Sequence, residues 1–99
     1  MPKFTADRYD VEGTDAFFKS CEGFEHLRSR RRNDLLTIIS GPGDDPVVHA
    51  RIRRVTKQWW ELEAPTSSGR WEKTGLRGNR IDLLDRVMTD FEWLLAPRE

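Results

Sequence analysis

Two segments of alternating polar and apolar residues, joined by a short link, constrain the fold of this chain more than any other feature. The alternation runs through residues 47–55 and again through residues 58–64. A period of two places successive side chains on opposite faces, as in a half-buried β-strand. The link around Thr56 is short enough for a hairpin, so residues 47–64 are predicted to pair in antiparallel fashion. The face predicted to be buried carries Val48, Ala50, Ile52, Trp60, Leu62 and Ala64, and the face predicted to be exposed carries His49, Arg51, Arg53, Trp59, Glu61 and Glu63.

Segments on either side extend this pair into a meander. Residues 35–39 are apolar and rich in β-branched side chains, and residues 40–46, with two glycines and two prolines, end them with a loop. After the pair, residues 65–69 favour a turn, and residues 70–74 favour a return strand. The prediction is an antiparallel meander of three or four strands.

Apolar residues at helical spacing predict two helices. The first is short, about Asp15 to Glu22, and residues 1–12 before it are predicted to be an arm or an edge strand. The second begins after Asn79, which is its predicted N-terminal cap, and ends before Pro97. Its apolar stripe is wide enough to cover the buried face of the sheet, and it contains Ile81, Leu84, Val87, Met88, Phe91, Leu94 and Leu95. We therefore expect one small α+β domain over residues 1–99, with helices on one side of the sheet.

Composition excludes several functional classes. The 99 residues include 17 Lys+Arg and 17 Asp+Glu, so the formal net charge is zero, and no overall basic excess points to nucleic acid. One cysteine rules out an internal disulfide, and one cysteine with two histidines gives too few good ligands for a zinc site, so no metal or cofactor is expected. No signal-like segment opens the chain and no apolar run approaches the roughly 20 residues that span a bilayer. We expect a soluble, cytoplasmic protein that does not bind membranes.

The basic residues are nevertheless concentrated in residues 26–32 and 51–80, whereas the rest of the chain is acidic. The candidate contact surface for a partner or a nucleic acid comprises Arg30, Arg31, Arg32, Arg51, Arg53 and Trp59. Guanidinium groups beside an exposed aromatic side chain suit single-stranded nucleic acid. The alternative is that Glu61 and Glu63, predicted on the same face, pair with the arginines across the strands and leave a solvated salt-bridge ladder.

A second candidate site is the Gly75–Arg80 segment, before the last predicted helix. Arg77, Gly78 and Arg80 could hold a small anion there, because backbone N–H groups are free at a helix start and two guanidinium groups lie close by in the sequence. The alternative is an ordinary strand-to-helix turn with Asn79 as the helix cap.

Catalytic signals are weak throughout the chain. Cys21 lies among phenylalanines, which favours a buried small hydrophobe over a thiolate nucleophile, and no base is identifiable near it. Trp60, Trp71 and Trp93 are predicted to be core residues, whereas Trp59 is predicted to be exposed and to contact a partner. The preferred function is a non-catalytic module that binds a protein partner or self-associates. Binding of RNA or single-stranded DNA through the Arg/Trp face is the alternative, and binding of a small anion is the third.

Overall fold

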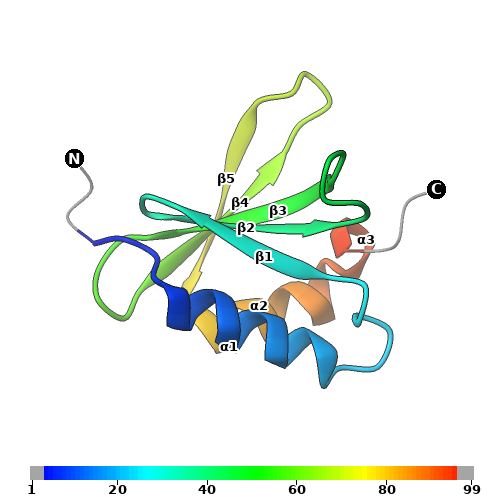
Figure 1. Cartoon of the computed structure of the whole chain (residues 1–99). Coiled ribbons are helices and arrows are strands. Elements are labelled where there is room, and N and C mark those ends of the chain that lie inside the picture. The colour runs from blue at the N-terminus through cyan, green and yellow to red at the C-terminus, as the bar shows by residue number, and fades with distance from the viewer. Residues whose placement is uncertain (1–3, 96–99) are drawn as a thin grey trace.

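A computed structural model describes residues 4–95 of the chain (Figure 1). Its elements, in chain order, are α1 (Arg8–Lys19), β1 (Arg28–Arg32), β2 (Leu35–Ser40), β3 (Val47–Arg54), β4 (Trp60–Pro65), β5 (Trp71–Gly78), α2 (Arg80–Asp90) and α3 (Glu92–Leu95). The five strands form one antiparallel sheet in the order β1-β2-β3-β4-β5. The α+β class is therefore confirmed, but the sheet has five strands rather than three or four. No helix within residues 4–95 has the length and apolar character needed to cross a membrane.

The additional strand is β1, which consists of four arginines and one serine. It pairs with the apolar β2 strand, and the tight turn between them uses Asn33 in the left-handed region, at φ 55°. On the inner side, Ser29 is held to α1, because its backbone N–H and its hydroxyl both donate to the Asp15 carboxylate at 2.6 and 2.9 Å. A run of arginines has no alternation of polar and apolar residues, so the sequence does not predict a strand here. The strand forms because it pairs with β2.

The first helix begins seven residues earlier than the sequence predicts. Asp7 and Asp10 form a reciprocal capping box, so residues 8–12 are helical and are not an arm or an edge strand. Gly13 and Thr14, which precede the predicted helix, lie inside α1. A Cβ atom at Gly13 would lie 2.7 Å from a guanidinium nitrogen of Arg80, which crosses it from α2, so a larger residue there would require the end of the arginine side chain to move.

The C-terminal helical region is interrupted. Asn79 caps α2 as predicted, since its side-chain oxygen accepts from the backbone N–H of Asp82 at 2.9 Å. The helix ends at Asp90 with Phe91 as its C-terminal cap, and α3 begins at Glu92 in a new direction. The predicted stop at Pro97 lies outside the described residues.

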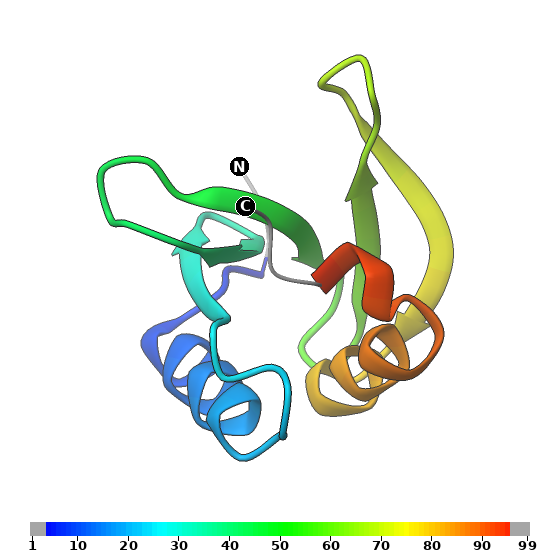
Figure 2. The same cartoon turned by 90° about the vertical axis from the view of Figure 1, so that its right-hand side faces the viewer.

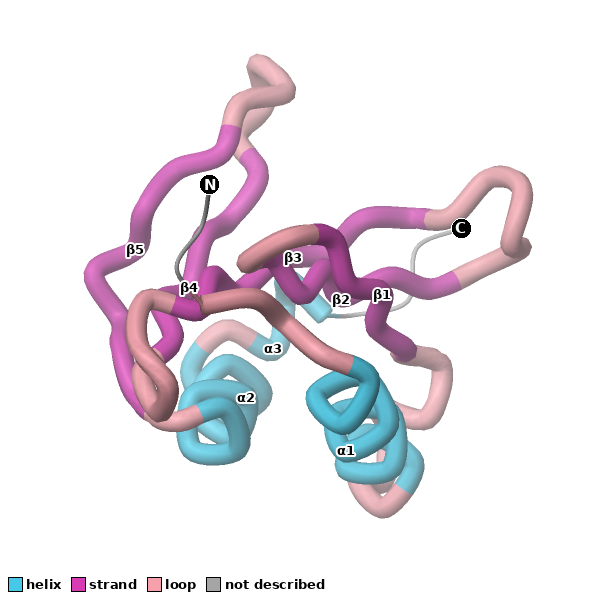
Figure 3. The backbone as a smooth tube through the Cα atoms, turned by 60° about the vertical axis from the view of Figure 1, so that its left-hand side comes forward, coloured by secondary structure: helices cyan, strands magenta, loops and turns pink. Residues whose placement is uncertain are grey.

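The helices cover one face of the sheet and leave the other open. Figure 2 shows the sheet strongly bent, with the β4–β5 hairpin standing up from the β1–β3 half, and Figure 3 shows α1 and α2 side by side below it. The core between sheet and helices includes Phe18, Leu36, Ile38, Ile52, Trp60, Leu62, Leu84, Val87 and Leu95. Cys21 is half-buried and packs against this core. The bend turns the helix-free face into a concave surface, which we call the outer face.

A bulge in β3 reverses part of the predicted alternation. Ile38 pairs with Ala50 but Ile39 pairs with Val48, so His49 is an extra residue in β3. His49 therefore points inward and is fully buried, and Val48 lies on the outer face; both predictions were wrong. The Nδ1 atom of His49 donates to the Leu94 carbonyl at 2.8 Å, and its Nε2 atom accepts from the Ser40 hydroxyl at 2.7 Å. His49 thus attaches α3 to the sheet.

Candidate functional site

The strand register arranges the outer face in two rows. One row runs Arg30, Thr37, Arg51 and Glu63 across β1 to β4, and the next runs Arg32, Leu35, Arg53, Glu61 and Arg77 across β1 to β5. Positive side chains therefore lie at the β1 end of each row, and the glutamates lie on β4. The sheet brings together the arginines that the sequence separates by about twenty positions.

The glutamates do pair with arginines, but unequally. Glu63 accepts from the Nε atoms of Arg51 at 2.6 Å and Arg53 at 3.0 Å, and it is only 3% exposed although it lies on the helix-free face. Arg53 also binds Asp34 at 2.8 Å. Arg53 is thus held between two carboxylates, whereas Arg51 uses only its Nε atom in the hydrogen bonds of the described residues, and its two terminal nitrogens have no such partner.

This arrangement shifts two ionisation equilibria in opposite directions. Burial by itself would raise the pKa of Glu63, but the hydrogen bonds and charges of Arg53 and Arg51 outweigh it and lower that pKa below its ordinary value of 4.5. The hydrogen bond from Glu63 likewise raises the pKa of Arg53, against the opposing effect of burial. Glu63 is therefore ionised at neutral pH, as the charged centre of a structural triad.

A groove opens on the outer face beside this triad. Its volume is about 590 Å³, and it is lined by Arg30, Arg31, Arg32 and Arg51 together with Trp71, Leu35, Thr37 and Val48; we call it the arginine groove. The Arg51 guanidinium stacks on the Trp71 ring, 4.3 Å from the centroid. Arg30 and Arg32 are exposed and form no ion pair with any of residues 4–95, while Arg31 donates to the Ala6 carbonyl at 3.5 Å.

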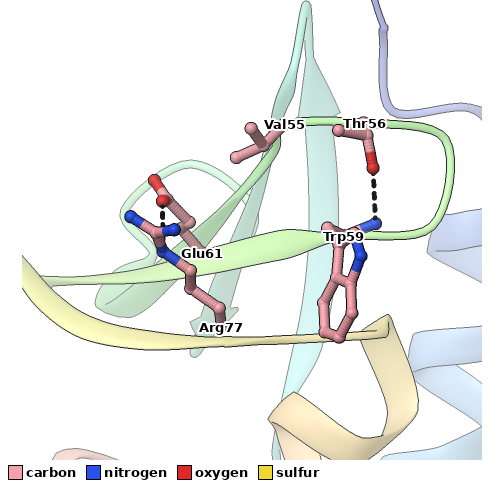
Figure 4. A pocket seen from close by; sticks show the side chains of 5 residues that line it. All are labelled: Val55, Thr56, Trp59, Glu61 and Arg77. Atoms are coloured by element: carbon pink, nitrogen blue, oxygen red, sulfur yellow. Dashed lines mark hydrogen bonds and ion pairs between the residues drawn. The ribbon is translucent and has the colours of Figure 1, made fainter.

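Trp59 lines a different pocket from the arginines with which the sequence groups it. Together with Val55, Thr56, Glu61 and Arg77 it surrounds an open pocket of about 460 Å³, which we call the Trp59 patch (Figure 4). The Trp59 side chain is exposed as predicted, at 55%. The wall opposite the indole is formed in part by Arg77, whose Nε donates to Glu61 at 2.8 Å. Of the six predicted contact residues, four line the arginine groove, Trp59 lies in its own patch, and Arg53 lines neither.

The loop that carries Trp59 is held by several hydrogen bonds. The backbone N–H of Trp59 donates to the Thr56 hydroxyl at 3.2 Å, and its carbonyl accepts from the N–H groups of Val55 and Thr56. Arg54 adds a brace from the preceding strand, since its guanidinium donates to the Lys57 carbonyl at 2.7 Å and also contacts Asp10 of α1 at 3.4 Å. The indole therefore projects from a hairpin whose backbone is held by hydrogen bonds.

The predicted anion-binding residues do not converge. Arg77 turns toward Glu61, and Gly78 is a buried strand residue. Arg80 turns the other way, where it donates to the Thr14 hydroxyl at 3.0 Å and lies 3.5 Å from the Asp10 carboxylate. The two guanidinium groups thus join separate ion pairs, and Asn79 occupies the helix start as a cap.

Two other tryptophans also differ from their predicted places. Trp93 in α3 is 66% exposed rather than in the core, because the chain changes direction at Phe91. Trp71 is half-buried on the outer face, where it contacts Arg51 instead of the core. Trp71 pairs with Pro65 across the β4–β5 turn, and Pro65 has the same strand parity as Glu61 and Glu63, so the strand register places Trp71 on the outer face.

The described residues contain no cluster of three or more His, Cys, Asp and Glu side chains arranged to hold a metal ion. Comparison with protein-family models, with curated proteins and with solved structures finds no match to this chain.

Proposed function

We propose that this domain is a non-catalytic module that binds a partner protein through the Trp59 patch. The observation that carries the proposal is a large, exposed indole fixed on a braced hairpin, with Val55 also exposed beside it. Large exposed aromatic side chains are the residues that most often dominate binding energy at protein interfaces. The apolar character of this pocket favours a hydrophobic surface on the partner, and the exposed Arg77 supplies a polar rim.

The order of the hairpin adds to this argument. Binding normally costs free energy when loops and side chains are immobilised at the interface. Here the backbone around Trp59 is already held by hydrogen bonds to Thr56 and from Arg54, so binding should cost little free energy for ordering this loop. Neither edge of the sheet favours a second copy of the chain, because β1 presents arginines and β5 is distorted around Gly75, at φ 84°. We therefore propose a different protein as the partner.

Trp59→Ala should weaken partner binding strongly, whereas Trp93→Ala should leave it unchanged. A photoreactive phenylalanine analogue at position 55, which lines the same patch and leaves the indole intact, would capture the partner in the native cells, and calorimetry with the purified partner would give its Kd. Loss of an anchoring tryptophan costs about 2 kcal/mol or more at an interface, which corresponds to at least a roughly 30-fold increase in Kd. Trp93 is the matched control because it is also an exposed tryptophan and lies on another element.

Equal effects of the two substitutions would contradict the proposal, as would a partner crosslinked at position 93 but not at 55. Sedimentation of the purified chain tests the remaining alternative. If the chain sediments as a dimer that Trp59→Ala dissociates, the patch is a self-association surface and the proposal of a different partner is wrong.

A further inference from the structure

The arginine groove carries an excess of positive charge, and part of that charge has no acidic partner among the described residues. Four of its lining residues are arginines and none is acidic. The nearest carboxylate, Glu63, is buried and shared between Arg51 and Arg53. Arg30 and Arg32 form no ion pair among the described residues, and the terminal nitrogens of Arg51 also lack a partner there. These donors are available to an anionic ligand.

The sheet fixes the backbone spacing of these arginines. Arg30 and Arg32 lie on the same face of β1, two residues apart, which is a spacing of about 7 Å along a strand. Arg30 and Arg51 lie in one row with Thr37 between them, which is about 10 Å across two strand spacings. An array of this extent matches a chain of repeated negative charges better than a single small anion.

Trp71 indicates which kind of polyanion the groove would bind. The Arg51 guanidinium lies 4.3 Å from the centroid of the Trp71 ring. A flat aromatic and cationic surface therefore lies in the same groove as the other arginines. Unpaired nucleobases stack on tryptophan rings and on guanidinium planes, whereas an acidic peptide has no flat group that needs such a surface. In a duplex the faces of the bases are covered by their neighbours, so this stack suits a single strand.

We propose that the arginine groove binds single-stranded nucleic acid, with phosphates at Arg30 and Arg32 and a base against the Trp71–Arg51 stack. The groove is separate from the Trp59 patch, so this inference does not depend on the proposed protein partner.

The test is fluorescence anisotropy of a labelled 12-nucleotide single strand, as oligo-U RNA and oligo-dT DNA, titrated with the whole chain between 50 and 200 mM KCl. A DNA duplex and a labelled 12-residue polyglutamate peptide are the comparison ligands. We expect salt-sensitive binding of the single strands, weaker binding of the duplex, and the weakest binding of polyglutamate. No binding of single strands at 50 mM KCl would overturn the proposal, and so would polyglutamate or duplex binding as tight as that of the single strands.

Variants separate the two parts of the site. Arg30→Gln with Arg32→Gln should weaken binding about tenfold and reduce the slope of log K against log salt by about 0.7 per arginine. Arg86→Gln is the control, because Arg86 is an exposed arginine on α2, on the helix side of the sheet. Trp71→Leu should weaken binding roughly tenfold without changing the slope, and Trp71→Phe should retain most of the affinity. Thermal melting would establish that each variant is folded.

Equal losses in Arg86→Gln and in the Arg30/Arg32 variant would mean that the charge effect is not local and would overturn the proposal. Trp59→Ala should leave nucleic-acid affinity unchanged, since Trp59 does not line the groove. If Trp59→Ala lowers partner binding but not nucleic-acid affinity, the two sites are independent, and either proposal can then be rejected without rejecting the other.

Discussion

Replacing His49 by leucine should lower the free energy of unfolding by about 3 kcal/mol, because two buried polar groups lose their partner at once. The Ser40 hydroxyl and the Leu94 carbonyl both hydrogen-bond to the fully buried imidazole. In the variant neither group would regain a partner inside the core. For a domain of this size the melting temperature should fall by more than about 10 °C, as measured by circular dichroism.

His26→Leu is the natural control for this substitution. His26 also holds a carbonyl at the C-terminal end of the structure, through a 2.7 Å contact between Nε2 and the Leu95 oxygen, but it is only half-buried and has a single such contact. We expect a loss of about 1 kcal/mol. Adding Ser40→Ala to His49→Leu should restore roughly 1 kcal/mol, because the unpaired hydroxyl is removed. If the two histidine variants were equally stable, the assigned role of His49 would be wrong.

The second large effect is expected at Glu63. Glu63→Ala removes the acceptor that Arg51 and Arg53 share and should lower the free energy of unfolding by about 3 kcal/mol, since loss of one partner leaves buried or half-buried charge unpaired. Glu61→Ala is the matched control on the same strand and face. Its partner, Arg77, is highly exposed, so the loss should stay below about 1 kcal/mol. Urea unfolding at pH 7 measures both values.

The contribution of Glu63 should also depend on pH in a defined direction. The pKa of Glu63 is lower in the folded chain than its ordinary value of 4.5, so the folded state binds the proton less readily than the unfolded state. The stabilisation is fully present above the ordinary pKa, and it is lost as the pH falls through the folded pKa. The difference in unfolding free energy between the native chain and Glu63→Gln should therefore be constant from pH 7 to 5 and shrink in more acidic solution. A difference that stays constant down to pH 3 would show that the carboxylate charge is not what stabilises the triad.

Local patterns in the sequence were sufficient for the class of the fold. The alternation in residues 47–64 placed Ile52 and Leu62 in the core, and an Asn residue followed by an apolar stripe located the start of α2. Each depends on chemistry within a few residues, namely the period of two in a strand and the free N–H groups of a helix start. The exposure of Trp59 was also predicted, from its position in the alternation of residues 58–64.

What the sequence by itself determined, then, was the class of the fold and the position of most core residues, because burial periodicity is a local property. The tertiary structure alone decided three further features: that the arginines of β1 form a strand, that the bulge in β3 turns His49 inward, and that Trp71 rather than Trp59 joins the arginine groove. Each of these depends on pairing or bending between segments distant in the sequence. The sequence of one β-strand does not specify the register in which the neighbouring β-strand pairs with it. A shift of one residue in that register moves a side chain to the opposite face of the sheet.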